Sequence, residues 1–362
     1  MKQKKLLYIA PHRPGRSPGQ RFRFEQFVEF LQENGYLITY SHIINEYDDK
    51  ILYKKGKYLR KLFIGIKAIF VRFKDVLRAN KYDIVLVYRE AHFIGSSFFE
   101  KQFAKSNAKL VFDFDDAIWL NDTSEGNRNL KWLKNPAKIG TIIEICDLVI
   151  AGNNYLKEYA NIFNQNTLLI PTTIDTNYHK LKYNKKDSKA ICIGWTGSMT
   201  TIKHFEQAIP FLVKLKDKYK DAISFKIIVD MQYNVVELNL KSTLWNINTE
   251  IEELNKIDIG IMPLPNDLWS KGKCGFKGIQ YMALEIPTVM SPVGVNTDII
   301  EDGINGFLAD TESEWIEKLS LLIESEGLRK KIGVEGKNTI EQKYSLNSQK
   351  QILLEALDNL II

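Results

Sequence analysis

Residues 262–296 have the sequence MPLPNDLWSKGKCGFKGIQYMALEIPTVMSPVGVN, which predicts the end of a strand, a basic loop, a helix and a second strand. The isoleucine-rich run at 257–262 that leads into it is typical of a strand buried on both faces. Pro287 ends the helical pattern, and a β-branched run follows at 288–291. Parallel sheets are built from such strand–helix–strand units. The stretch therefore predicts an α/β fold.

The same alternation extends over most of the chain. Strands are predicted at 5–10, 83–88, 109–114 and 147–151, and again at 190–195, 224–229, 258–262 and 288–291, with helical patterns at 22–34, 201–219, 275–284 and 312–325. A polar stretch at 175–188, DTNYHKLKYNKKDS, separates the two sets and is predicted to be a linker. We expect two doubly wound Rossmann-like domains, at 1–174 and 189–345, that face a central cleft.

Composition excludes several classes of protein. Of the 362 residues, 44% are hydrophobic and 26% are charged, which is an ordinary globular mixture. The net charge of +6 is too small for general coating of nucleic acid. No apolar run approaches the roughly 18 residues of a transmembrane helix, and the N-terminus lacks a signal-peptide core, so a cytoplasmic protein is expected. Three dispersed cysteines, without a CxxC pair, predict neither a zinc site nor a disulfide framework.

Two strand ends in the second half carry the signs of a phosphate site. The loop before the helix at 275–284 contains Lys271, Lys273 and Lys277 among glycines at 272, 275 and 278. Glycines allow a ligand to approach the backbone, and the first turn of a helix offers unpaired N–H groups. The alternative is a plain basic surface loop. At 193–203, IGWTGSMTTIK, a strand runs into Gly197 and Ser198, with Lys203 in the next helix; this second signal alone is weak.

In the first half, a glycine- and arginine-rich loop follows the first strand. Residues 10–23, APHRPGRSPGQRFR, contain Gly15 and Gly19 and are predicted to form a mobile basic loop. The strand at 109–114 leads into Asp113, Asp115 and Asp116. Their carboxylates could bind metal, accept sugar hydroxyls, polarise an acceptor, or cap a following helix. The neighbouring Tyr88-Arg89-Glu90 is predicted to hold a structural ion pair.

One segment, 51–78, is biased in composition. It has nine basic residues and a single acid, Asp75, interleaved with large apolar residues at helical spacing. Such a helix suits an anionic membrane surface. The alternative is an amphipathic helix whose apolar face belongs to the core and whose lysines are solvated.

The second half resembles the retaining GT-B glycosyltransferases of the large family-four type, the group 1 glycosyl transferases of cell-envelope polysaccharide synthesis. The resemblance rests on IPTTIDTNYH (170–179), IGWTGSMTTIKHF (193–205), KCGFKGIQYMALEIPTVMSPVGVN (273–296) and IIEDGINGFLA (299–309). The first half matches more loosely. The resemblance implies a GT-B fold whose last helix, 346–362, crosses back to the N-terminal domain.

The resemblance also implies a nucleotide-sugar site that needs no metal. The cationic pair of the family falls on Lys203 and a loop lysine, for which Lys277 is the first choice. The donor site that it implies further comprises Gly197, Ser198, Lys271, Lys273, Gly275, Phe276 and Gln280, with Gly15 or Gly19 facing the diphosphate from the other side. The family's E-x7-E motif is lost, since its glutamates fall on Gly272 and Gln280. The usual strand-end histidine falls on Asp115.

The function implied is transfer of a sugar, with retention, from a UDP- or GDP-linked donor to a glycan or polyprenyl-linked acceptor. Asp115 and Asp116 orient hydroxyls, while Lys203 and Lys277 stabilise the leaving diphosphate. A polyprenyl acceptor makes contact of 51–78 with the inner face of the cell membrane more plausible. Two alternatives stay open: a catalytically silent nucleotide-binding partner of another transferase, because the glutamates are lost, and a GT-B sugar-nucleotide epimerase. A nicotinamide-dependent dehydrogenase lacks its glycine fingerprint after the first strand.

Overall fold

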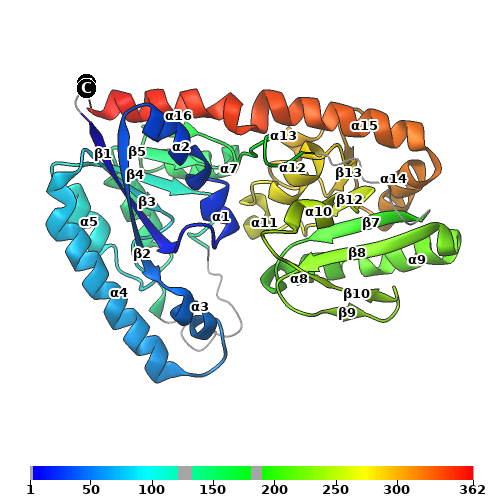
Figure 1. Ribbon diagram of the computed structural model, residues 1–362, viewed down its shortest axis with the longest axis horizontal. Helices are drawn as coiled ribbons and strands as arrows, with labels where there is room; N and C mark the ends of the chain where they lie inside the picture. The colour runs from blue at the N-terminus through cyan, green and yellow to red at the C-terminus, as the bar shows by residue number, and fades with distance from the viewer. Residues whose placement is uncertain (1–2, 121–132, 181–189, 362) are drawn as a thin grey trace. The chain divides into compact units, whose positions relative to one another are not determined.

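The computed structural model describes residues 3–120, 133–180 and 190–361 (Figure 1). The chain divides into two compact units, Met1–Thr172 with Gln349–Ile362, and Thr173–Ser348. We call them unit 1 and unit 2. Of the linker predicted at 175–188, residues 181–188 lie outside the described part of the chain.

Unit 1 is built on a six-stranded parallel sheet. Its strands are β1 (Lys4–His12), β2 (Tyr36–Ile44), β3 (Ile84–Tyr88), β4 (Lys109–Phe114), β5 (Leu148–Ala151) and β6 (Thr167–Leu169), in the order β2-β1-β3-β4-β5-β6. The sequence patterns predicted β1, β3, β4 and β5, whose central residues are fully buried. They missed β2 and β6, because both are edge strands whose residues are only partly buried and so lack a continuous apolar run.

Helices cover both faces of this sheet (Figure 1). They are α1 (Pro18–Arg21), α2 (Val28–Glu33), α3 (Glu46–Leu52), α4 (Tyr58–Arg78), α5 (Phe98–Ala104), α6 (Lys138–Glu144), α7 (Asn154–Asn161) and the C-terminal α16 (Leu346–Ile361). The end of α16 belongs to unit 1 by its contacts: Leu353 and Leu357 are buried, and Asp358 accepts hydrogen bonds from Lys4 and Tyr36, both at 2.6 Å. Within the described ranges, no helix has both the length and the apolar character needed to cross a bilayer.

Unit 2 repeats the architecture. Its sheet contains β7 (Ile191–Thr196), β8 (Ile223–Val229), β11 (Thr243–Leu244), β12 (Ile259–Met262), β13 (Thr288–Met290) and β14 (Phe307–Leu308), all parallel, in the order β11-β8-β7-β12-β13-β14. A separate antiparallel pair joins β9 (Asn234–Val235) and β10 (Leu240–Lys241). Two six-stranded parallel sheets with helices confirm the predicted fold class of two Rossmann-like domains.

The helices of unit 2 are shorter than the sequence patterns suggested. They are α8 (Ile202–Glu206), α9 (Ile209–Tyr219), α10 (Glu250–Leu254), α11 (Leu268–Lys271), α12 (Phe276–Ala283), α13 (Asn296–Ile299), α14 (Glu312–Glu324) and α15 (Glu326–Thr339). The single helix predicted at 201–219 is divided in two. Pro210 lies in the first turn of α9, where its missing N–H costs least, and it cannot continue the hydrogen bonds of α8.

In each unit the strand order reverses at one point. The chain passes from β1 to β2 on one side and then returns to β3 on the other side, and it does the same at β7, β8 and β12. Ligands of open α/β sheets bind beyond the carboxyl ends of the strands at such a reversal. The loops after β1 and β3, and those after β7 and β12, are therefore the places to search for a site.

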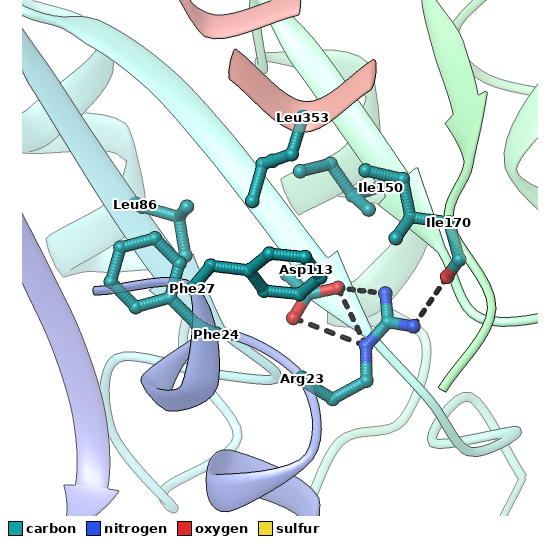
Figure 2. Close-up of a pocket in the computed structure, with 8 residues that line it drawn as sticks. All are labelled: Arg23, Phe24, Phe27, Leu86, Asp113, Ile150, Ile170 and Leu353. Carbon is teal, nitrogen blue, oxygen red and sulfur yellow. Dashed lines mark hydrogen bonds and ion pairs between the residues drawn. The ribbon is translucent and has the colours of Figure 1, made fainter. Parts of the chain in front are cut away.

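A buried ion pair lies beneath the first of these positions (Figure 2). The Arg23 guanidinium donates to both carboxylate oxygens of Asp113 on β4, with an Nη2–Oδ1 distance of 2.5 Å, and Nη1 donates to the backbone oxygen of Ile170. Both charged side chains are almost fully buried, and Leu353 of α16 lines the same pocket. Burial of this kind is tolerated only when each charge has its partner.

Arg23→Met is therefore expected to destabilise the protein by about 3–5 kcal/mol, because Asp113 is left charged and buried without a partner. The double variant Arg23→Met, Asp113→Leu removes both charges and should recover most of that loss. Urea unfolding of the wild type and the two variants measures the difference. A single variant no less stable than the double one contradicts a structural role for the pair.

Candidate functional site

The end of β7 forms a tight turn that only glycine permits. The Trp195 ring is fully buried and folds over Gly197, where an added Cβ would lie 2.2 Å from the ring. Ser198 then begins the short 3-10 helix at Met199–Thr201, where its side chain and that of Thr201 form a capping box. Lys203 follows on α8 and is exposed. The predicted strand–turn–helix at this position is present.

The end of β12 leads into a second glycine-dependent turn. Gly275 has a φ of 67° and precedes α12, and a Cβ there would lie 2.3 Å from Cδ1 of Ile299. A side chain is therefore excluded both by conformation and by space. Phe276 and Lys277 occupy the first turn of α12. The N-terminal end of this helix carries partial positive charge.

Three lysines of these two segments act on one buried histidine through their charges. Lys277 Nζ is 5.3 Å from the centre of the Trp195 ring, and Lys273 Nζ is 4.9 Å from that of Trp269. His204 of α8 is buried, and its pKa is lowered to about 4 by burial and then by the charges of Lys277, Lys273 and Lys203. The imidazole is therefore neutral at neutral pH. The two motifs that were separate in sequence form one cationic cluster in unit 2.

Polar atoms without partners lie in the same place. His204 Nδ1 and Trp195 Nε1 are buried and have no hydrogen-bond partner within the described part of the chain. Three cations, the positive end of the α12 dipole and these buried polar atoms favour an anionic ligand of diphosphate size. Among the described residues, no three side chains of His, Cys, Asp or Glu gather in a way that could hold a metal ion.

Gln280 and Gly272 occupy the two positions where the family motif has glutamate. Gln280 lies on α12, is buried, and its Nε2 donates to Glu250 Oε1 at 3.4 Å. The same carboxylate oxygen accepts from Trp245 Nε1 at 3.1 Å. Gly272 ends α11, close to Lys271 in its last turn. The Gln280 amide is therefore directed toward a buried carboxylate. Sequence reasoning did not find Glu250, because it begins an acidic helix of ordinary composition.

In unit 1, two aspartates beyond β4 are held by one arginine. Asp115 accepts hydrogen bonds from the Tyr88 hydroxyl at 2.9 Å and from Arg89 Nε at 2.7 Å, and Arg89 Nη2 lies 2.5 Å from Asp116 Oδ2. Burial raises the pKa of Asp115, but the Arg89 charge and hydrogen bond outweigh it, so the net pKa is below the ordinary value. Arg89 adopts a φ of 60°, a strained conformation for a residue with a side chain.

These contacts decide between the alternatives for the aspartates. Residues 115–120 form turns and no helix, so helix capping is excluded within that stretch. The predicted structural pair at Arg89 exists, but its partners are the aspartates themselves, and Glu90 pairs with Lys138 at 2.9 Å. The cluster carries two carboxylates and one guanidinium, so it retains one negative charge and can accept hydroxyl donors.

The basic segment after β1 makes ion pairs with carboxylates from other parts of unit 1. Arg13 and Arg16 both pair with Asp49 of α3, and Arg23 is buried against Asp113. Gly15 has a φ of 76° and donates its N–H to Glu25 at 2.7 Å. Asp49 and Asp113, which pair with three of the four arginines, lie far away in sequence, so no local pattern predicts these ion pairs.

Gly19 instead lies against the aspartate cluster. A Cβ at this position would be 2.0 Å from the Tyr88 hydroxyl and 3.0 Å from Asp115 Oδ2. The sequence singled out Gly19, Asp115 and Asp116, and the structure brings them together. It assigned no role to the Tyr88 hydroxyl or to His204, because their contacts come from distant parts of the chain.

Comparison with known proteins finds similarity to glycosyltransferases. Residues 191–325 match the family model described as Glycosyl transferases group 1. The capsular polysaccharide biosynthesis glycosyltransferase CapM of Staphylococcus aureus is 25% identical over 211 residues, which are 52% of this chain and 50% of that protein, so the match spans only half of the relative's length.

Solved structures agree over the whole chain. A glycosyltransferase from Rickettsia africae ESF-5 has a TM-score of 0.70 at 16% identity, with coverage of 100% of this chain and 99% of that one. Anabaena Alr3699/HepE, solved in complex with UDP and glucose, has a TM-score of 0.69 at 14% identity, with coverage of 99% and 100%. The fold is therefore GT-B, as the resemblance in sequence predicted, and residues 191–325 of unit 2 are similar to the glycosyl transferases group 1.

The buried histidine gives a prediction on pH. Because the pKa of His204 falls from 6.5 in the unfolded chain to about 4, the unfolded state binds more protons between these values. Folding stability should therefore fall as the pH is lowered from 6.5 to 4, and His204→Asn should remove roughly 1–3 kcal/mol of that loss. Denaturant unfolding at pH 7, 6, 5 and 4 measures the slope. An unchanged slope in the variant contradicts the assignment.

The space at Gly19 gives a second prediction. Gly19→Ala should lower the free energy of unfolding by about 1–3 kcal/mol, because the methyl group displaces the Tyr88 hydroxyl from Asp115. Gly65→Ala is the matched control, since no atom lies within 4 Å of a Cβ there and alanine favours the α4 helix. Thermal unfolding compares the two. Equal stability of both variants would show that the close approach at Gly19 is absent.

Proposed function

We propose that this protein is a glycosyltransferase that moves a sugar from a nucleoside-diphosphate donor to a glycan or lipid-linked acceptor, with retention of anomeric configuration. The expected location is the cytoplasm, at the inner face of the cell membrane. The glycosyl transferases group 1 domain supports the reaction class. CapM, a relative in capsular polysaccharide biosynthesis, supports a role in polysaccharide synthesis.

The observation that carries the proposal is the cationic cluster of unit 2. The charges of Lys203, Lys273 and Lys277 all act on His204, near the reversal of strand order between β7 and β12 and the N-terminal end of α12. A departing diphosphate gains negative charge as the glycosidic bond breaks. Donors already in place for that charge lower the barrier by about 2.7–4 kcal/mol each, or roughly a hundred- to thousandfold in rate.

The proposed reaction needs few further groups from the protein. As the leaving group departs, the sugar becomes oxocarbenium-like. The acceptor hydroxyl attacks from the face that the diphosphate leaves, and its proton passes to the departing diphosphate oxygen. No protein nucleophile is needed. We propose that Lys203 and Lys277 do the work that a metal ion does in other diphosphate sites, so that the reaction is independent of metal. Backbone groups around 263–268 are candidates for recognition of the base, with UDP the first choice and GDP the second.

Asp115 and Asp116 are proposed to orient sugar or acceptor hydroxyls. Arg89 holds both carboxylates and keeps the pKa of Asp115 low, so this carboxylate accepts hydrogen bonds and does not transfer protons. The strained backbone of Arg89 is consistent with a functional position.

A second candidate function is a catalytically silent nucleotide-binding subunit. Gly272 and Gln280 replace both glutamates of the family motif, and the Gln280 amide donates a hydrogen bond to Glu250. Such a protein would bind a nucleotide and neither transfer nor hydrolyse the donor sugar.

Thermal unfolding with UDP, GDP, CDP, ADP and dTDP, with and without EDTA, tests the donor site. Ligand at a hundred times its dissociation constant adds about 2.7 kcal/mol of stability. We expect a shift with one nucleotide that EDTA does not change, and loss of that shift in Lys277→Ala. Lys330→Ala is the matched control, an exposed lysine of the same unit. No shift with any nucleotide contradicts the donor site, and a shift that EDTA abolishes contradicts metal independence.

Turnover separates the two candidate functions. Incubation with the sugar-linked form of the nucleotide that binds should release free nucleoside diphosphate, slowly by hydrolysis and faster with acceptor. Lys277→Ala should lower this rate tenfold or more while the unfolding temperature stays unchanged. Binding without any turnover favours the silent subunit, and full activity of Lys277→Ala contradicts the role of this lysine.

A further inference from the structure

Helix α4 of unit 1 turns its apolar side away from the core. Leu59 is 75% exposed, Phe63 69%, Phe70 70% and Leu77 83%, and the stripe is completed by Leu62, Ile66 and Phe73. The spacing of these residues places them on one side of the helix, in a stripe about 100° wide. Figure 1 shows α4 on the outside of unit 1, between α3 and α5. An apolar stripe of this kind normally faces the core.

The side of α4 that packs on the sheet is instead mixed, with three charged residues among small and apolar ones. Its buried residues are Lys61, Ile64, Gly65, Ala68, Arg72 and Asp75. Arg72 is fully buried and donates to the backbone oxygens of Ala10 and Ala91 and to Asp75 Oδ2, the last at 2.9 Å. Lys61 Nζ donates to the backbone oxygen of Lys54. These contacts fix which side faces inward, so the apolar stripe is not part of the core, contrary to the alternative left open by the sequence.

Cations flank the stripe. Arg60, Lys67 and Lys74 repeat every seven residues along one edge, and Lys67 pairs with Asp48 of α3. The single acid of α4, Asp75, is buried between Arg72 and Arg78 and places no negative charge on the exposed side. The surface therefore combines large apolar side chains with net positive charge.

The apolar surface continues onto the neighbouring helix. Phe73 contacts the rings of Phe98 and Phe99 at centroid distances of 5.9 and 5.3 Å, and Phe98 of α5 is itself 45% exposed. Lys101 follows one turn later and is exposed. With 21 residues, α4 is about 30 Å long. A contiguous exposed apolar surface of this length marks an interaction site.

We propose that the outer side of α4 docks the protein on an anionic lipid bilayer. The helix lies in the plane of the interface, with Phe63 and Phe70 among the acyl chains and Arg60 and Lys74 at lipid phosphates. Charge decides between this occupant and a second copy of the chain, because two such surfaces face to face would bring like charges together. The inference does not depend on the proposed transferase activity.

Flotation with phosphatidylcholine vesicles, with and without about one third phosphatidylglycerol, tests the surface. The wild-type protein should bind the anionic vesicles, and binding should weaken as salt is raised. Phe63→Ser with Phe70→Ser should reduce binding roughly tenfold or more. Ile162→Ser with Val236→Ser is the matched control, since these side chains are 71% and 87% exposed elsewhere on the chain, and it should bind as the wild type does.

Charge and oligomeric state complete the test. Arg60→Gln with Lys74→Gln should reduce binding to anionic vesicles roughly tenfold and leave the unfolding temperature unchanged. Failure of the wild type to float with anionic vesicles overturns the proposal, as does binding by the Phe63, Phe70 variant at the wild-type level. Sedimentation without lipid measures the oligomeric state. A wild-type dimer that becomes monomeric in the Phe63, Phe70 variant would show that a second copy covers this surface, and it would also overturn the proposal. Vesicle binding without any nucleotide-induced shift would overturn the donor site alone.

Discussion

The buried pair of Arg23 and Asp113 is the constraint on which the candidate site of unit 1 depends. One guanidinium joins the segment after β1, the end of β4 and the backbone at Ile170, which is 147 residues away in sequence. Separation of the pair would leave a charge without solvent or partner, so the loop that carries Gly19 is held in place. Asp115 lies two residues beyond Asp113 on nearly extended chain, and Arg23 helps to lower its pKa. A structural ion pair and a candidate binding cluster therefore share one strand end.

The sequence around this strand end could predict the location of a site and not the role of each residue. Parallel strands place their carboxyl ends at one edge, so the acids after β4 and the glycines after β1 were expected at the same edge of the sheet. Which aspartate is structural depends on Arg23, ninety positions earlier, and on Tyr88 and Arg89 of the neighbouring strand. The local spacing of residues in the sequence cannot predict these ion pairs and hydrogen bonds. The same holds for His204, whose surroundings come from two separate loops.

Helix α4 shows the limit of periodicity most clearly. The spacing of its apolar residues predicts a helix with one apolar side, and the helix is present. Periodicity gives the direction of the apolar side relative to the helix, but it cannot say whether the core lies in that direction. Burial of Arg72 and Asp75 decides this, because their hydrogen bonds to the backbone and to each other are made only when their side of the helix faces inward. Edge strand β2 was missed for a related reason, since its pattern reflects partial burial.

Two features of the chain lower its stability. One is a group of like charges and the other is a set of apolar side chains exposed to water. Lys203, Lys273 and Lys277 place like charges around a buried imidazole, with Asp267 the acid that acts on it in the opposite sense. The outer side of α4 leaves Phe63 and Phe70 in water while Arg72 is buried. Sequences that fold well avoid such local conflicts except where function requires them. A diphosphate would relieve the first conflict and a lipid surface the second, so each points to the chemistry of its own ligand.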